Sequence, residues 1–202
     1  MKIALYGGSF DPPHYGHFAV AALAREFITP DKLILSVSQN PLKAVQATPS
    51  RHRLEMTRRF AEDLAATCTA AEQIEVSDWE AMQGTPSYTV DSLRRLKSIY
   101  PQAMLYLCIG EDNLRVFDQW RSADEILNLA QLIVFTRQSR TNADAPYPIS
   151  SEQFTRIHLD FAVAATGIRT AIAAAPDAPE SYRFVPSPVA HYIQQHRLYR
   201  AT

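Results

Sequence analysis

The stretch KIALYGGSFDPPHYGH, residues 2–17, decides how this chain folds. Its apolar opening, residues 2–6, has the length and composition of a buried strand. Two glycines follow, and Pro12 and Pro13 then hold the backbone extended, which delays the next helix until about residues 15–16. The stretch therefore predicts a strand, a turn, and a helix whose first N–H groups point into the space above the strand end.

The rest of the chain repeats this alternation of strands and helices. Further apolar runs predict strands at 32–38, 73–79, 103–110 and 130–137, and a weaker one at 155–163. Helical spacing of apolar residues predicts helices at 16–27, 51–66 and 89–100, and two more near the end. This spacing indicates βαβ units, so we expect an α/β fold, a single doubly wound domain over residues 1–202 with a mostly parallel sheet and C-terminal helices.

Composition narrows the class of protein. The 202 residues are 47% hydrophobic, which is enough for one sizeable core. The formal net charge is −1 and there is no long basic run, so we expect no nucleic-acid partner. Without a run of 18 apolar residues or a signal-peptide core, we expect no membrane span. Two cysteines far apart in sequence, Cys68 and Cys108, favour a reduced, cytoplasmic protein.

Two histidines, His14 and His17, flank the predicted start of the first helix. A protonated imidazole in the first turn opposes the helix dipole, so stability alone does not favour the pair. An anion at the same place reverses the argument, because helix amides and imidazolium groups would all face negative charge. We therefore interpret both histidines as phosphate ligands. Two other interpretations stay open: histidines that pack or cap, and a metal site, for which further ligands are not obvious.

Other nucleotide-binding and catalytic motifs do not fit. The sequence has no Gly-Lys pair, which excludes a Walker A loop, and no G-x-G-x-x-G fingerprint. GGSFD, residues 7–11, matches a nucleophile elbow for three residues, but Asp11 stands where the final glycine is required. No Ser-His-Asp or Cys-His arrangement is apparent.

GGSFDPPHYGH, residues 7–17, resembles the signature of the nucleotidyltransferase superfamily, whose members carry HxGH or TxGH at the first helix. Further segments resemble the bacterial nicotinate-nucleotide adenylyltransferase family in order and spacing. These segments are QNPLKAVQATPSRHRLEM (39–56), PSYTVDSL (86–93), IGEDNLRVFDQW (109–120), LIVFTR (132–137) and YIQQHRLYR (192–200). The resemblance implies a Rossmann-like fold. It also implies adenylyl transfer from ATP to nicotinate mononucleotide with a divalent metal, giving nicotinate adenine dinucleotide and pyrophosphate.

The resemblance also implies roles for individual residues. A phosphate oxygen of the mononucleotide would be the nucleophile, so catalysis would consist of positioning and charge stabilisation by His14 and His17. Mg²⁺ would be held mainly by the ATP phosphates. The ATP-binding residues would be Gly8, Ser9, Phe10, Gly110, Asp112, Thr166 and Arg169. The residues that bind the pyridine mononucleotide would be Lys43, Tyr88, Thr89 and Trp120, with Arg51 and Arg137 as weaker candidates.

Several of these positions also have plain structural interpretations. Lys43 could be an exposed lysine, Arg51 could begin a solvated helix, Thr89 could be a helix N-cap, and Trp120 could be a packing residue.

One segment departs from the family pattern Ser-Ser-Thr-x-Ile-Arg. Here it reads AATGIR, residues 164–169, so Ala164 and Ala165 replace both serines. A lost hydrogen bond to a charged group costs about 1.5–3 kcal/mol. We therefore expect weaker ATP binding or a compensating contact, and not a loss of activity.

Three alternatives to the implied activity remain. The acceptor could be nicotinamide mononucleotide or another phosphate, or the chain could be a nucleotide-binding sensor that has lost catalysis. The sequence also leaves open whether the protein forms a homo-oligomer.

Overall fold

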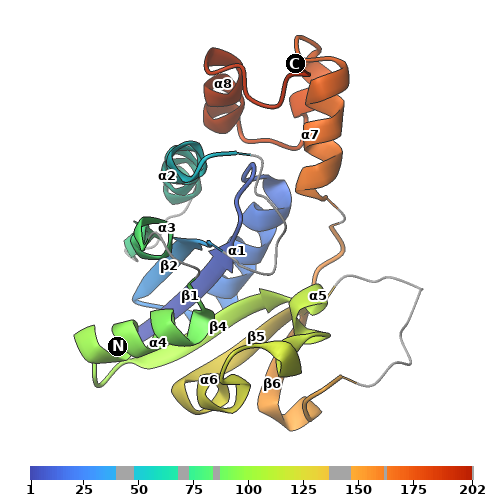
Figure 1. The fold of residues 1–202 in the computed structure, drawn as a ribbon. Coiled ribbons are helices and arrows are strands. Elements are labelled where there is room, and N and C mark those ends of the chain that lie inside the picture. Colours follow the sequence, from blue (N-terminus) through green and yellow to red (C-terminus); the bar gives the residue numbers. More distant parts are fainter. Residues whose placement is uncertain (40–47, 68–72, 84–86, 137–146, 162, 202) are drawn as a thin grey trace.

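Six parallel strands form one sheet in the computed structural model, which describes residues 1–39, 48–67, 73–83, 87–136, 147–161 and 163–201 (Figure 1). The strands are β1 (Lys2–Gly8), β2 (Lys32–Val37), β3 (Gln73–Ser77), β4 (Met104–Gly110), β5 (Ala130–Thr136) and β6 (Phe154–His158). Their order in the sheet is β3-β2-β1-β4-β5-β6, and every neighbouring pair is parallel. β2 and β3 therefore follow β1 toward one edge of the sheet, and β5 and β6 follow β4 toward the other edge. In such a sheet, ligands bind at this switch point, outside the carboxyl ends of the two central strands.

Helices cover both faces of the sheet. They are α1 (Tyr15–Ile28), α2 (Ser50–Ala66), α3 (Trp79–Met82), α4 (Thr89–Ile99), α5 (Glu111–Leu114), α6 (Ala123–Leu129), α7 (Ala165–Ala174) and α8 (Ser187–Gln195), with short 3₁₀ turns η1 (Phe117–Gln119), η2 (Ser151–Gln153) and η3 (Pro179–Tyr182). In β1, Ala4 and Tyr6 belong to the core under α1 and α2, whereas Ile3 and Leu5 belong to the core under α4 and α6. This alternation confirms the doubly wound α/β fold, Rossmann-like, that the sequence predicts.

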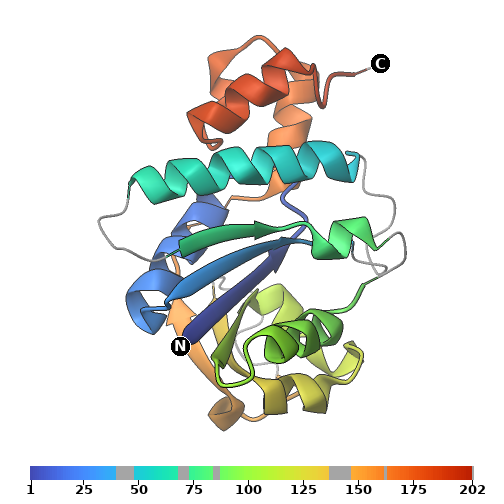
Figure 2. The same cartoon turned by 90° about the vertical axis from the view of Figure 1, so that its left-hand side faces the viewer.

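The last two helices form a further layer beyond α2. Figure 2 shows α8 lying over α2, on the side away from the strands, and Figure 1 shows α7 to one side of α8 at the same end of the molecule. Their apolar residues Ile168, Ile172, Val189 and Ile193 join the same buried cluster as α1 and α2. The end of the chain is thereby packed close to the helices that follow β1 and β2.

The sixth strand ends earlier than the sequence predicts. The apolar run 155–163 was expected to be one strand, but pairing with β5 stops at His158. Leu159, Phe161 and Val163 instead line a cavity on the way to α7. Their apolar character therefore reflects a cavity wall and not a strand core.

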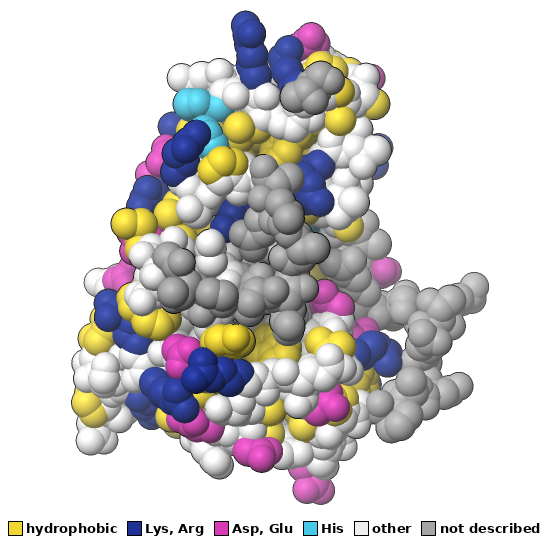
Figure 3. Space-filling view, in the orientation of Figure 1, with side chains coloured by type: hydrophobic (Ala, Val, Ile, Leu, Met, Phe, Trp, Pro, Cys, Tyr) yellow, Lys and Arg dark blue, Asp and Glu magenta, His cyan; other side chains and the backbone are white. Residues whose placement is uncertain are grey.

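The surface carries charges of both signs. In the view of Figure 3, Lys and Arg side chains are interspersed with Asp and Glu over the described part of the chain, as a formal net charge of −1 leads one to expect. No helix among the described residues combines the length and the apolar character that crossing a membrane requires.

Candidate active site

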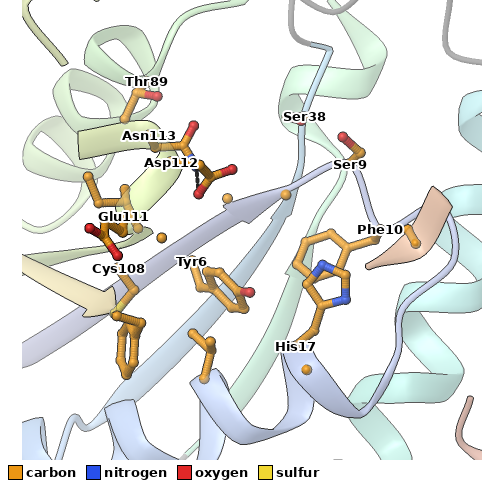
Figure 4. A pocket seen from close by; sticks show the side chains of 18 of the residues that line it. Tyr6, Ser9, Phe10, His17, Ser38, Thr89, Cys108, Glu111, Asp112 and Asn113 are labelled. Atoms are coloured by element: carbon orange, nitrogen blue, oxygen red, sulfur yellow. Dashed lines mark hydrogen bonds between the residues drawn. The ribbon is translucent and has the colours of Figure 1, made fainter. Parts of the chain in front are cut away.

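A cavity of about 1000 Å³ opens over the carboxyl ends of β1 and β4, at the switch point of the sheet (Figure 4). Most of the residues that the sequence singles out lie in its wall: Gly8, Ser9, Phe10, His14, His17, Tyr88, Thr89, Gly110, Asp112, Trp120, Thr166 and Arg169. Arg51 is exposed on α2 and is not among the lining residues. Lys43 and Arg137 fall outside the residues that the structure describes.

The two histidines cap α1 and hold each other in place. His14 is the N-cap, and its Nδ1 accepts a hydrogen bond from the Gly16 amide at 3.1 Å. His17 Nδ1 accepts one in return from the His14 amide at 3.2 Å, which completes a capping box. The ring centroids are 3.9 Å apart. The capping interpretation is therefore confirmed, and it coexists with a position in the cavity wall.

This capping box assigns the tautomer of both rings. A nitrogen that accepts a hydrogen bond carries no proton, so the proton of each neutral imidazole is on Nε2. Protonation of Nδ1 would break the cap. The imidazolium pair suggested by the sequence is thus not needed, because each neutral ring is an N–H donor through Nε2.

The amides of α1 are not available to an anion, contrary to the expectation from sequence. Tyr15 N donates to the Phe184 carbonyl at 2.9 Å, Gly16 N to the His14 ring, and His17 N to the His14 carbonyl at 2.8 Å. The protein uses these donors itself. Any phosphate contact at this helix therefore has to come from the imidazoles.

The start of α7 shows the opposite arrangement. Ala164 is its N-cap and has no side chain that could accept a hydrogen bond. Within the described part of the chain, no group accepts a hydrogen bond from the amides of residues 165–167, and the first helical bond is that of Ile168 to Ala164 O. Ala164, Ala165 and Thr166 line the cavity. With alanine at 164 and 165, no side chain of the described residues caps these amides.

Arg169 lies beside that helix start. Its Nη1 donates to the Asp11 carbonyl at 2.8 Å, and its Nη2 donates to Thr166 Oγ1 at 3.3 Å. These two bonds hold the guanidinium between α7 and the loop that joins β1 to α1. An arginine, an imidazole pair and open helix amides therefore surround one part of the cavity, and all of them suit a phosphate.

The loop between β1 and α1 is held in a strained conformation. Phe10 has a φ of 47°, in the left-handed region that is uncommon for residues other than glycine. Phe10 is 1% exposed, and the centroid of its ring lies 4.9 Å from that of the His17 ring. Figure 4 shows the two rings next to each other. A side chain at Gly8 would come within 3.1 Å of the Phe10 ring. Glycine at position 8 therefore leaves room for the Phe10 ring, which packs against the His17 ring.

Arg53 on α2, and not the sequence candidate Arg51, fixes the same loop. Its Nη1 donates to the carbonyls of Ser9 and Ser38, both at 2.9 Å, and the side chain is 1% exposed. This guanidinium ties the loop after β1 to the end of β2. Arg53 lies two helical turns before Phe60, so both side chains are on the buried face of α2. This spacing could have identified Arg53 as a buried residue from the sequence.

Another wall of the cavity is built around the start of α4. Tyr88 is the N-cap and Thr89 the first helical residue, so the interpretation of Thr89 as an N-cap is wrong. Trp120 is half-buried, and its ring packs 5.4 Å from Phe117. The Arg121 guanidinium lies 4.8 Å above the Tyr88 ring. Aromatic rings and a cation thus line this wall together.

Glu80, which the sequence analysis did not single out, holds this wall to the sheet. Its buried carboxylate accepts hydrogen bonds from Ser36 at 2.9 Å, Ser87 at 3.1 Å and Ser92 at 2.8 Å. These serines come from β2, from the segment before α4 and from α4 itself. One carboxylate therefore fixes the segment that leads into Tyr88.

The end of β4 carries the acidic part of the cavity wall. A side chain at Gly110 would meet Asp112 Oδ1 at 2.5 Å, so only glycine allows the present position of that carboxylate. Glu111 accepts hydrogen bonds from Tyr147 at 2.6 Å and from Arg115 at 2.7 Å. Burial would raise the pKa of Glu111, but these hydrogen bonds outweigh it and lower the pKa, so the carboxylate is charged at neutral pH.

Comparisons with known proteins agree on one kind of enzyme. Residues 5–157 match the family described as Cytidylyltransferase-like. A "Probable nicotinate-nucleotide adenylyltransferase" from Chloroherpeton thalassium is 44% identical over 200 residues, which cover 98% of each chain. One of the same description from Prosthecochloris aestuarii is 42% identical over 206 residues, again 98% of each chain.

Solved structures with a similar fold include an enzyme of the same kind. The nicotinic acid mononucleotide adenylyltransferase of Plasmodium falciparum, solved with NaAD, superposes with a TM-score of 0.74 at 17% identity and covers 98% of this chain and 97% of its own. The same enzyme solved with APC gives a TM-score of 0.72.

Proposed function

The chain belongs to the cytidylyltransferase-like family, and we propose that it transfers the adenylyl group of ATP to nicotinate mononucleotide. The products are nicotinate adenine dinucleotide and pyrophosphate, a step in the biosynthesis of NAD. In this proposal residues 1–202 form a single nucleotidyltransferase domain that works in the cytoplasm.

One observation carries the proposal. A single cavity contains groups suited to a polyphosphate, namely His14, His17 and Arg169, and also an aromatic wall with Tyr88 and Trp120. The first set suits ATP, and the second suits a flat cationic ring such as pyridinium. The relatives at 42–44% identity over nearly their whole length carry the same activity in their names.

The reaction needs no protein nucleophile. An oxygen of the mononucleotide phosphate, ionised at neutral pH, attacks the α-phosphorus of ATP, and the bond to the leaving pyrophosphate breaks. Catalysis then depends on bringing two anions into line and stabilising charge in the transition state. The cavity supplies donors for both tasks without a general base.

The histidine pair provides donors at fixed positions. The capping box places the proton of each ring on Nε2, and the backbone bonds to Nδ1 orient both rings. We assign the Nε2–H groups of His14 and His17 to ATP phosphate oxygens around the α-phosphorus. Because the rings are oriented before ATP arrives, the donors need no reorganisation during the reaction.

The start of α7 and Arg169 would hold the other ATP phosphates. The amides of residues 165–167 have no acceptor within the described residues, and the positive end of the helix dipole favours an anion there. These amides are the compensating contact that the absence of serine hydroxyls at 164 and 165 requires. In the same proposal, the loop at Gly8, Ser9 and Phe10 lines the path of the incoming phosphate.

The pyridine mononucleotide would lie against the start of α4. Trp120 would stack on the pyridine ring, and Tyr88 and Thr89 would receive the nicotinate carboxylate at the helix N-terminus. Lys43 and Arg137 are retained as phosphate-binding candidates on the family resemblance alone.

A divalent cation would be held mainly by the phosphates of ATP. Mg²⁺ is commonly bound through substrate phosphates with few protein ligands, and when bound it neutralises charge on the phosphate oxygens. Among the residues that the structure describes, no group of three or more His, Cys, Asp or Glu side chains could hold a metal ion. We propose Mg²⁺ as the cation, on the family resemblance, held mainly by the ATP phosphates.

An assay of pyrophosphate release tests the function. With ATP and Mg²⁺, we expect release with nicotinate mononucleotide, and a kcat/KM about tenfold lower with nicotinamide mononucleotide, because the amide lacks the charge that favours a helix N-terminus. A higher kcat/KM with the amide or with another phosphate acceptor would overturn the assignment of the substrate. Nucleotide binding without any pyrophosphate release would favour the sensor alternative.

Replacing Gly110 with alanine tests the role of Asp112. The new Cβ would stand 2.5 Å from Asp112 Oδ1 and push the carboxylate away from its position. If Asp112 binds the ATP ribose, we expect the KM for ATP to rise about tenfold, the value of one hydrogen bond to a charged group. Asp112 and Thr89 appear on the same side of the cavity in Figure 4. A rise confined to the KM of the mononucleotide would therefore assign Asp112 to the ribose of the mononucleotide instead of the ribose of ATP.

A further inference from the structure

The chain after α8 returns to the loop that follows β1. The Tyr199 hydroxyl donates a hydrogen bond to Asp11 Oδ1 at 2.6 Å, between residues 188 positions apart. Tyr199 has a φ of 65°, so the backbone adopts a left-handed conformation to place the ring there. Burial and the neighbouring Asp11 raise the pKa of Tyr199, so its hydroxyl keeps its proton and remains a donor at neutral pH.

Asp11 is the residue where several parts of the site meet. Its side chain is 6% exposed, and its carbonyl accepts the hydrogen bond from Arg169 Nη1. It directly follows Phe10, whose ring supports His17. The Arg53 guanidinium also interacts with the Asp11 charge, which raises the pKa of that arginine against the larger lowering effect of burial. The orientation of Asp11 therefore bears on both the arginine and the imidazoles of the site.

We infer that Tyr199 is a positioning residue for ATP, acting through Asp11. Its hydroxyl fixes the Asp11 carboxylate on one side while Arg169 binds the Asp11 carbonyl on the other. Without the hydroxyl, a nearly buried carboxylate lacks this donor and reorients, with the Arg53 charge left to attract it. Because the Asp11 carbonyl holds Arg169 Nη1, a reoriented Asp11 shifts the guanidinium that would bind the ATP phosphates. This inference rests on the proposed function, because it assumes that Arg169 binds ATP.

The test replaces Tyr199 with phenylalanine, which removes the hydroxyl and keeps the ring. A matched control exists in Tyr182, whose hydroxyl donates to the Pro176 carbonyl at 2.7 Å and which is not among the cavity-lining residues. We expect Tyr199→Phe to raise the KM for ATP about tenfold and to leave the KM for nicotinate mononucleotide within about twofold. Tyr182→Phe should leave both constants unchanged while lowering the melting temperature by a similar amount.

A double-mutant cycle separates an action through Asp11 from a general loss of packing. In an Asp11→Asn background, Tyr199→Phe should cause little further change in the KM for ATP, because the charged acceptor is already absent. Additive effects of the two substitutions, or a Tyr199→Phe variant that behaves like Tyr182→Phe, would overturn the inference. Binding of a non-hydrolysable ATP analogue, measured by calorimetry, should weaken in parallel with the rise in KM.

Failure of this inference is distinguishable from failure of the proposed function. A wild-type protein that releases no pyrophosphate with nicotinate mononucleotide contradicts the proposed function. An active wild-type protein with an unaffected Tyr199→Phe variant contradicts the positioning role alone.

Discussion

Replacing His17 with alanine is expected to lower kcat by about 10²–10³-fold, the usual loss for one preorganised donor at a transition state. The KM for nicotinate mononucleotide should stay within about threefold. The reason is geometric: His17 Nδ1 accepts a hydrogen bond from the His14 amide, so the ring proton is on Nε2, the donor that we assign to an ATP phosphate. Steady-state kinetics of pyrophosphate release measures both constants.

A second variant separates this catalytic loss from the loss of the helix cap. Glutamine is a standard partner at this capping-box position, so His17→Gln should restore the bond from the His14 amide without an imidazole. We expect it to recover the melting temperature and not kcat. His191→Ala, on the exposed side of α8, is the control histidine. A His17→Ala variant with wild-type kcat would remove His17 from the mechanism.

Replacing Gly16 with alanine is expected to lower kcat by about 10²-fold, although both histidines remain. A Cβ at this position would stand 2.8 Å from Cε1 and 2.9 Å from Nδ1 of His14, closer than real Cβ atoms approach their neighbours. The ring has to move, which breaks its bond to the residue 16 amide and shifts its Nε2. A displacement of about 1 Å at a reacting centre can cost about 10²-fold in rate.

Gly167 provides the matched control for this substitution. It also lies in the first turn of a helix beside the cavity, but a Cβ there would meet nothing within 4 Å. Gly167→Ala keeps the backbone amide that we assign to ATP, so it should raise the free energy of unfolding by up to about 1 kcal/mol through helix propensity without the loss of kcat expected for Gly16→Ala. Equal kinetic effects of the two alanines would show that the rigidity of a helix start, and not the His14 contact, explains the loss.

The order of strands and helices could be predicted because it depends on local patterns. β1, β2, β4 and β5 are buried on both faces, so their sequences are nearly continuous apolar runs. The edge strand β6 was predicted too long, because apolar residues after His158 line the cavity. A linear pattern does not distinguish these two uses of apolar residues.

That the glycines and histidines after β1 lie in one cavity could be predicted as well, but not how they are held. The glycines and histidines of residues 7–17 lie in one turn of chain, so their meeting is a local event. The acceptor for the Tyr15 amide is Phe184 O, and the donors to Glu80 include Ser36, 44 positions away. Such partners are set by tertiary packing, for which sequence spacing carries no signal.

The hydrogen bond between Tyr199 and Asp11 has a consequence for how the protein is made. Translation proceeds at about 5–20 residues per second, so the nascent chain waits about 10–40 s between emergence of the aspartate and of its phenolic partner. During that interval the remaining strands of the sheet are synthesised, but the hydrogen bond from Tyr199 to Asp11 cannot yet form. If Tyr199 positions Asp11 as we infer, competence for turnover comes only after almost the whole of this sequence has been translated.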